Sequence, residues 1–195
     1  MSEVISPGAD VVVDYDPAVW LAGPADPARA EPWTAAAVEA CAEDFGVEPG
    51  TADHDYLRAV LTGFASRDLP AANRFLRLRR LDDAPLVALL NVLVGLPGEQ
   101  LAGRFLDTWG DERWYDPPRV ETVDERTGLR RALRFKVDDD GISSVVRYHR
   151  RVDDLGLDVL LSCSGADLTA TTRGLPDLDG LARAVWVVTA AGERR

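Results

Sequence analysis

The residues able to act as nucleophiles or metal ligands are few. The chain holds two cysteines, Cys41 and Cys163, and two histidines, His54 and His149. A structural zinc site needs short spacings between its ligands, and these four residues are scattered, so we expect no metal and no other cofactor. A Cys-His dyad needs the thiol and the imidazole within hydrogen-bond reach. The register predicted below puts His149 and Cys163 on opposite faces of a sheet, so we predict two buried, structural thiols.

Other short motifs also argue against catalysis. The run 138–141, Asp-Asp-Asp-Gly, resembles part of a calcium loop, but the first and last ligand positions would be Lys136 and Arg147, which are cations. A hairpin turn explains the run better. Ser162 and Ser164 do not form the GxSxG turn of a serine hydrolase. The sequence therefore favours a protein without catalytic residues, although a pair of carboxylates assembled in space would leave no motif.

A row of cations occupies alternating positions of two predicted neighbouring strands. Its members are Arg130, Arg134, Lys136, Arg147, His149 and Arg151. Like charges on adjacent strands are unfavourable without a countercharge, so we expect acidic helices from the N-terminal part to pack across this face. The alternative is that the face stays open and binds an anion.

Negative charge is concentrated at the other end of the chain. Residues 1–72 hold thirteen Asp and Glu against Arg29, Arg58 and Arg67, a balance of −10, and residues 73–195 add −1 to give the total of −11. Such a surface repels a phosphate backbone, so we expect no nucleic-acid partner. It suits another protein with a basic surface.

Four acids are the candidate partner-binding residues: Glu39, Glu43, Asp44 and Glu48. Glu39 and Glu43 lie one helical turn apart without a compensating cation, which mildly destabilises a helix. A structural cost of this kind suggests selection for binding, and solubility is the competing explanation.

The apolar periodicity predicts the elements that position these residues. In the N-terminal part it predicts a strand over 10–15, an irregular connection over 17–32, a helix over 33–45 with Cys41 on its apolar stripe, and a helix over 53–66 capped by Asp53. His54 then lies in the first turn of that helix, where we expect a solvated side chain. Residues 75–94 fit either a hairpin or two helices, and the alternation of Leu76 and Leu78 with arginines favours the hairpin. A helix is expected over 97–109.

The last third alternates apolar and polar residues more regularly, with strands expected over 129–137, 142–152 and 157–164. Pairing Val137 with Ile142 places Phe135 opposite Ser144, Leu133 opposite Val146 and Arg131 opposite Tyr148; pairing Val152 with Leu157 places Cys163 opposite Val146. A short helix from Asp167, a second over 178–183 capped by Asp177, and a strand over 184–189 complete the chain. The fold class is α+β, with a mostly antiparallel twisted sheet flanked by helices.

This order of elements resembles a known family. An apolar hairpin (75–94), a helix (97–109), a three-strand meander (120–164) and the closing segment LPDLDGLARAVWVV are similar to the α/β/α sandwich of PsbP, the photosystem II extrinsic subunit, and its Mog-type Ran-binding relatives. The helices over 33–66 depart from the opening hairpin of that family. The resemblance implies a non-enzymatic binding scaffold and carries no site residue.

Composition sets the remaining expectations. The 195 residues, 46% of them hydrophobic, fit a single domain (1–195) with an acidic, largely helical part (1–72) and a sheet-rich part (73–195). The N-terminal residues lack a signal-peptide pattern, and the longest apolar run, 86–96, is too short for a bilayer, so we expect a cytoplasmic protein without a membrane partner. One lysine beside twenty-one arginines indicates a GC-rich, bacterial coding sequence.

These observations favour a cytoplasmic protein-binding module, such as an adaptor, chaperone or immunity-type inhibitor, that uses its acidic surface. The alternative is a small-molecule enzyme or an anion-binding protein that uses the basic face around Arg130, Arg134, Arg147 and His149. A cavity of several hundred Å³ with convergent ionisable groups would favour the alternative. The partner's identity and the oligomeric state leave no trace in the sequence.

Overall fold

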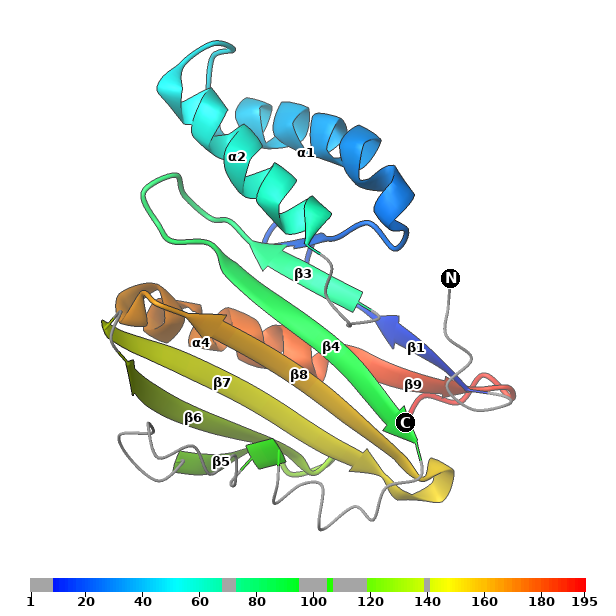
Figure 1. Cartoon of the computed structure of the whole chain (residues 1–195). Helices are drawn as coiled ribbons and strands as arrows, with labels where there is room; N and C mark the ends of the chain where they lie inside the picture. The colour runs from blue at the N-terminus through cyan, green and yellow to red at the C-terminus, as the bar shows by residue number, and fades with distance from the viewer. Residues whose placement is uncertain (1–8, 68–72, 95–104, 107–118, 139–140) are drawn as a thin grey trace.

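The main element of the fold is a seven-stranded antiparallel sheet. A computed structural model describes residues 9–67, 73–94, 105–106, 119–138 and 141–195 (Figure 1). Within these ranges the strand order is β2-β3-β4-β8-β7-β6-β5. The bounds are β2 Trp20–Ala22, β3 Asn73–Arg77, β4 Leu86–Val94, β5 Arg119–Asp124, β6 Leu129–Asp138, β7 Gly141–Val152 and β8 Leu157–Gly165. The predicted α+β class is confirmed.

The register of the central strands is the predicted one. Leu133 of β6 lies opposite Val146 of β7, and Val146 lies opposite Cys163 of β8. The turn between β7 and β8 is a short helical turn, η3 (Asp153–Leu155), ended by Gly156 with a φ of 63°. Side chains alternate between the two faces of a strand, so this register places Val146, Tyr148 and Cys163 on one face. All three are buried there.

One long helix, α4 (Leu168–Arg183), covers that face. Asp167 caps it by accepting a hydrogen bond from the backbone N–H of Ala170. Its buried residues are Ala170, Thr171, Gly174, Leu178, Leu181 and Ala182. The two separate helices predicted here are wrong: Pro176 removes one backbone hydrogen bond, but the apolar stripe continues through it and holds the helix on the sheet.

Partly buried ion pairs fix α4 to the sheet. Asp177, predicted as a helix cap, instead accepts a 2.6 Å hydrogen bond from Nε of Arg77 in β3. Asp179 pairs with Arg131 at 2.8 Å and accepts a hydrogen bond from the hydroxyl of Tyr148 at 2.7 Å. Arg131 interrupts an apolar row in the sequence because its guanidinium contacts α4 rather than the hydrophobic core.

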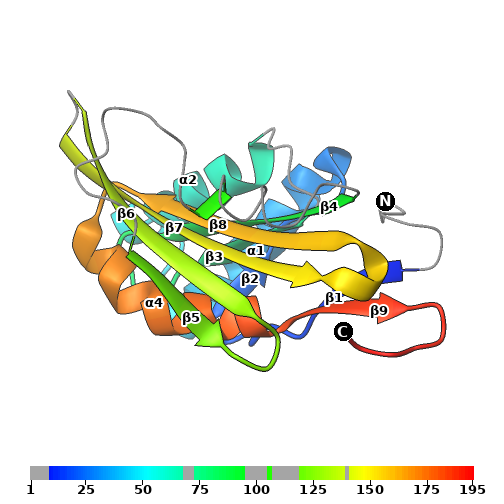
Figure 2. The same cartoon turned by 90° about the horizontal axis from the view of Figure 1, so that it is seen from below.

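Two further strands lie on the same side as α4. The strand β1 (Ala9–Val13) pairs with β9 (Val185–Thr189) in a separate two-stranded antiparallel sheet. Figure 2 shows α4 and this strand pair on one side of the main sheet and the helices α1 and α2 on the other. The strand predicted to close the chain is therefore confirmed, and it pairs outside the main sheet.

The helix pair α1 (Ala30–Phe45) and α2 (Ala52–Ser66) packs on the opposite face, over the edge formed by β2, β3 and β4. Its core contains Cys41, Leu57, Leu61 and Phe64 with Leu76 of the sheet. Nε1 of Trp33 donates a 3.0 Å hydrogen bond to the backbone oxygen of Ala22, which fixes α1 to β2.

The structure confirms some of the local predictions for these elements and corrects others. The strand β2, the short helix η1 (Pro27–Arg29) and the first turn of α1 occupy a region predicted to be irregular, and Pro32 is accommodated in that first turn. The hairpin over 75–94 is confirmed as β3 and β4. Thr51, not Asp53, caps α2. The helix expected over 97–109 falls outside the described residues except for Phe105 and Leu106. No helix in the described ranges is long and apolar enough to cross a membrane.

Candidate functional site

A groove between α1 and α2 is built by the tight connection that joins them. Gly46 ends α1 in the left-handed conformation, with a φ of 64°. The N–H of Val47 then donates to the carbonyl of Ala42, and Val47 packs on the core of the helix pair. Thr51 begins α2, its hydroxyl accepting from the N–H of His54 and donating to the carbonyl of Glu48. This connection places Glu48 and His54 beside the C-terminal half of α1.

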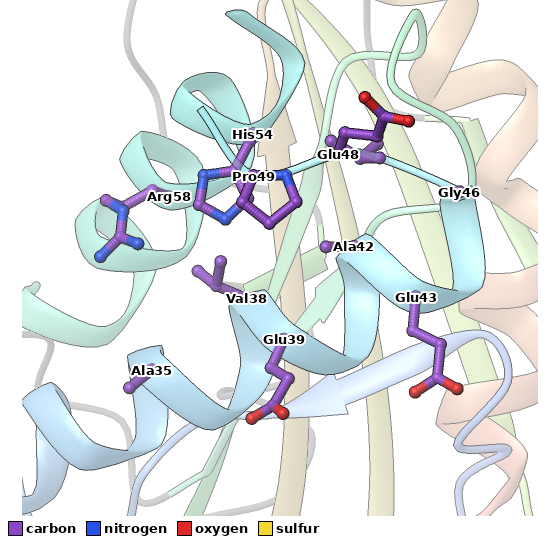
Figure 3. A pocket seen from close by; sticks show the side chains of 11 residues that line it. Ala35, Val38, Glu39, Ala42, Glu43, Gly46, Glu48, Pro49, His54 and Arg58 are labelled. Atoms are coloured by element: carbon purple, nitrogen blue, oxygen red, sulfur yellow. The ribbon is translucent and has the colours of Figure 1, made fainter. Parts of the chain in front are cut away.

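The groove has an apolar floor, and carboxylates extend from its edges (Figure 3). Its volume is about 510 Å³, and its lining residues are Ala35, Val38, Glu39, Ala42, Glu43, Gly46, Val47, Glu48, Pro49, His54 and Arg58. In Figure 3, Glu39 and Glu43 extend from α1 in the same direction, and Glu48 extends from the connection. His54 and Arg58 belong to α2 and form the facing wall.

Three of the four candidate partner-binding acids meet in this groove. Glu39, Glu43 and Glu48 line it, whereas Asp44 is exposed elsewhere on α1, near the thiol of Cys41. None of the four carboxylates forms an ion pair with any residue that the structure describes. The last turn of α1 contains no basic residue, so Glu43 and Asp44 also lie unfavourably at the negative end of the helix dipole.

The arrangement can bind a segment that carries both basic and apolar side chains. Val38, Ala42 and Val47 offer apolar contact area, and the flanking carboxylates accept hydrogen bonds from Lys or Arg. Among the described lining residues Arg58 is the only arginine and three are glutamates, so this part of the groove has excess negative charge. Electrostatic complementarity of this kind increases both association rate and selectivity.

The basic row lies on one sheet face as predicted, but the acidic helices do not cover it. Arg130, Arg134 and Lys136 of β6 and Arg147, His149 and Arg151 of β7 share that face by their register. The helices α1 and α2 pack at the other end of the same face, over β3, so the predicted neutralisation by the helices is wrong. The apolar residues Leu76 and Val87 of β3 and β4 attract the helix pair more strongly than the cations do.

Two members of the row, His149 and Arg151, find a countercharge on the neighbouring strand β8. Asp158 is fully buried, and its Oδ1 lies 2.8 Å from Nε2 of His149. Its other oxygen, Oδ2, accepts a hydrogen bond from Nη1 of Arg151. Sequence reasoning missed Asp158, although pairing Val152 with Leu157 already places it opposite Arg151. His149, expected on a wet face, is 3% exposed.

We predict that His149 makes stability depend on pH. Burial lowers its pKa from the ordinary 6.5, and the cations Arg130 and Arg151 lower it further, although Asp158 opposes them. The unfolded chain then binds the proton more readily than the fold does, so the contribution to stability is complete above pH 6.5 and is lost as the pH falls below it.

Urea unfolding at pH 7.5 and 5.5 measures this contribution. The free energy of unfolding of the wild type should fall by about 1 kcal/mol more than that of His149→Gln, which keeps an N–H donor but does not titrate. Equal losses in the two proteins would contradict the assignment.

The remaining candidate residues show no catalytic arrangement in the described part of the chain. His149 and Cys163 lie on opposite faces of the sheet, so the dyad is not formed. Both cysteines are free and buried, Cys41 on the inner face of α1 and Cys163 in the core beneath α4. His54 is half-buried in the wall of the groove.

Comparisons with known proteins give fold neighbours only. No protein-family model and no curated protein matches the chain. Among solved structures it is similar to LpqN of Mycobacterium tuberculosis, described as involved in cell envelope biogenesis (10% identity over 93% of this chain and 86% of that chain, TM-score 0.48). It is also similar to a mutant of the protein Mog1 (14% identity, 64% and 84%, TM-score 0.40) and to the Ran-binding protein Mog1p of Saccharomyces cerevisiae (12% identity, 58% and 77%, TM-score 0.38). These values do not assign the chain to a family, so its function is argued from the site alone.

Proposed function

We propose that this protein is a protein-binding module that uses the groove between α1 and α2 to hold a segment of a partner with basic and apolar side chains. The observation that carries the proposal is the set of carboxylates Glu39, Glu43 and Glu48 along an apolar floor, without ion-pair partners in the described part of the chain. An adaptor, a chaperone or an immunity-type inhibitor would use such a surface.

The contrast with other acids supports this reading. Elsewhere in the described residues, Asp14, Asp158, Asp177 and Asp179 are paired with arginines. The acids of α1 and α2 have no such partners within the described ranges. Exposed carboxylates without partners are free to pair with a cation brought by another molecule.

The two thiols support a proposal for the compartment in which the protein acts. Cys41 and Cys163 are free and lie far apart in the fold, in separate hydrophobic clusters. Reduced cysteines suit a reducing compartment, so we propose that the protein acts in the cytoplasm.

Charge reversal in the groove tests the proposal. A partner is first identified by mass spectrometry of the material that co-purifies with the tagged protein from its own host. We then expect Glu39→Lys/Glu43→Lys to slow association with that partner at least tenfold and to flatten its salt dependence, because the attraction to basic side chains is replaced by repulsion.

The matched control is Glu31→Lys/Asp44→Lys. Both of these acids are exposed on α1 and lie outside the groove, and the change in net charge is the same. This variant should keep at least half of the wild-type association rate. Equal effects of the two double variants would mean that net charge alone, and not the groove, determines the association rate. An unchanged rate in both variants would mean that the acids serve solubility.

A further inference from the structure

A second cavity lies on the sheet face that carries the basic row. Its volume is 600 Å³, in the range of small-molecule sites. Three strands form its floor: Val87 and Leu89 of β4, Ser162 and Ser164 of β8, and Val145 and Arg147 of β7. Phe105 and Arg67 contribute to its sides.

The register arranges these side chains in two rows across the sheet. In one row, Leu89, Ser162 and Arg147 lie opposite one another on three adjacent strands. In the next row, Ser164 lies opposite Val145. A hydroxyl and a guanidinium are therefore neighbours, with aliphatic side chains beside them on both flanking strands.

Arg147 is fixed at the wall of the cavity. Its Nη1 donates a 3.2 Å hydrogen bond to the backbone oxygen of Phe105, and its Cζ lies 5.5 Å from the centre of the Phe105 ring. Burial lowers the pKa of Arg147, and the neighbouring cation Arg134 lowers it further. A positive charge in such surroundings gains free energy from a nearby anion.

The other lining groups are also suited to an anion. None of the described lining residues is Asp or Glu. The hydroxyls of Ser162 and Ser164 have no hydrogen-bond partner among the described residues, so both are available as donors. The apolar side chains of Val87, Leu89 and Phe105 can contact only the hydrocarbon part of a ligand.

We propose that this cavity binds a small amphipathic carboxylate, with its carboxylate on Arg147 and Ser162 and its hydrocarbon part against Leu89, Val87 and Phe105. The site is separate from the groove between α1 and α2, since the two share no lining residue among those that the structure describes. The two sites can therefore be tested independently.

Calorimetric titration of the full chain with octanoate tests the proposal, with 1-octanol as the neutral analogue of the same length. Octanoate should bind with one-to-one stoichiometry, and 1-octanol at least tenfold more weakly. Arg147→Gln should weaken octanoate binding at least tenfold because the charge-assisted hydrogen bonds are lost. Arg130→Gln is the matched control, since Arg130 is exposed on the same sheet face and does not line the cavity.

Ser162→Ala provides a variant that does not disturb the contact between Arg147 and Phe105. It should weaken octanoate binding about threefold to tenfold while the urea midpoint stays unchanged. Equal binding of octanoate and 1-octanol, an equal loss in Arg130→Gln, or no octanoate binding would overturn the proposal. Inorganic phosphate that binds as tightly as octanoate would overturn it in favour of a simple anion site.

Discussion

Replacing Asp158 by Ala should lower the free energy of unfolding by about 3 kcal/mol, because the substitution removes a fully buried acid that bonds two basic side chains on this sheet face. Asp158 is fully buried, and it bonds both His149 and Arg151. Without it, the buried imidazole loses its carboxylate partner, and Arg151 loses its closest one, although the contact to Asp153 at 3.4 Å remains. The cost stays below that of a completely buried pair because the Arg151 side chain is 23% exposed and can partly reach water.

Asp153→Ala is the control for this prediction. Asp153 contacts the same arginine, but its side chain is 93% exposed, so its loss should change the stability by less than about 0.5 kcal/mol. Urea unfolding of the two variants and the wild type at pH 7.5 gives the comparison. Similar losses in both variants would mean that Asp158 contributes no more than a surface acid.

Asp158 also illustrates how much of the site the sequence could predict. The strand register followed from period-two alternation and from the two turns, and it correctly placed Arg131 opposite Tyr148 and Val152 opposite Leu157. With that register, Arg151 and Asp158 are cross-strand neighbours, so their ion pair was predictable. The burial of His149 could not be predicted from the sequence, because burial depends on contacts with segments that are distant in the sequence.

Tertiary contacts explain two predictions from the sequence that were wrong. Pro176 appeared to separate two helices, but a continuous apolar stripe from Ala170 to Ala182 holds one helix on the sheet. Charge complementarity suggested that the acidic helices cover the basic row, whereas burial of Leu57 and Leu61 against Leu76 places them over β3. In both cases burial of apolar surface outweighed a local or electrostatic preference.

The candidate groove was predictable only in part. The sequence singled out four acids of the N-terminal part, Glu39, Glu43, Asp44 and Glu48, and the fold brings all of them except Asp44 to one groove. The apolar floor and the facing wall with His54 and Arg58 required the tight turn at Gly46 and the cap at Thr51. A turn of this kind sets the angle between two helices, which periodicity within each helix does not specify.

The two thiols should be almost inert towards labelling in the folded protein. Burial raises the pKa of Cys163 to about 12, and burial, with a smaller contribution from Asp44, also raises the pKa of Cys41. At pH 8 a thiol with such a pKa forms on the order of a thousandfold less thiolate than an exposed cysteine, and the thiolate is the reactive species. Reaction of Cys163 with an aromatic disulfide reagent should therefore be at least a thousandfold slower in buffer than in 8 M urea, and burial should slow the reaction of Cys41 as well.

Slow labelling should then proceed through unfolding, and the Asp158→Ala variant tests this route. A loss of about 3 kcal/mol raises the unfolded population roughly a hundredfold, so labelling of Cys163 should accelerate by about the same factor. Asp153→Ala should label at nearly the wild-type rate. Cys41 belongs to α1 and lies in the smaller cluster between the helix pair and the sheet, so it should label no more slowly than Cys163, which lies in the main core. Rapid labelling of Cys163 in the native wild type would contradict its burial between the sheet and α4.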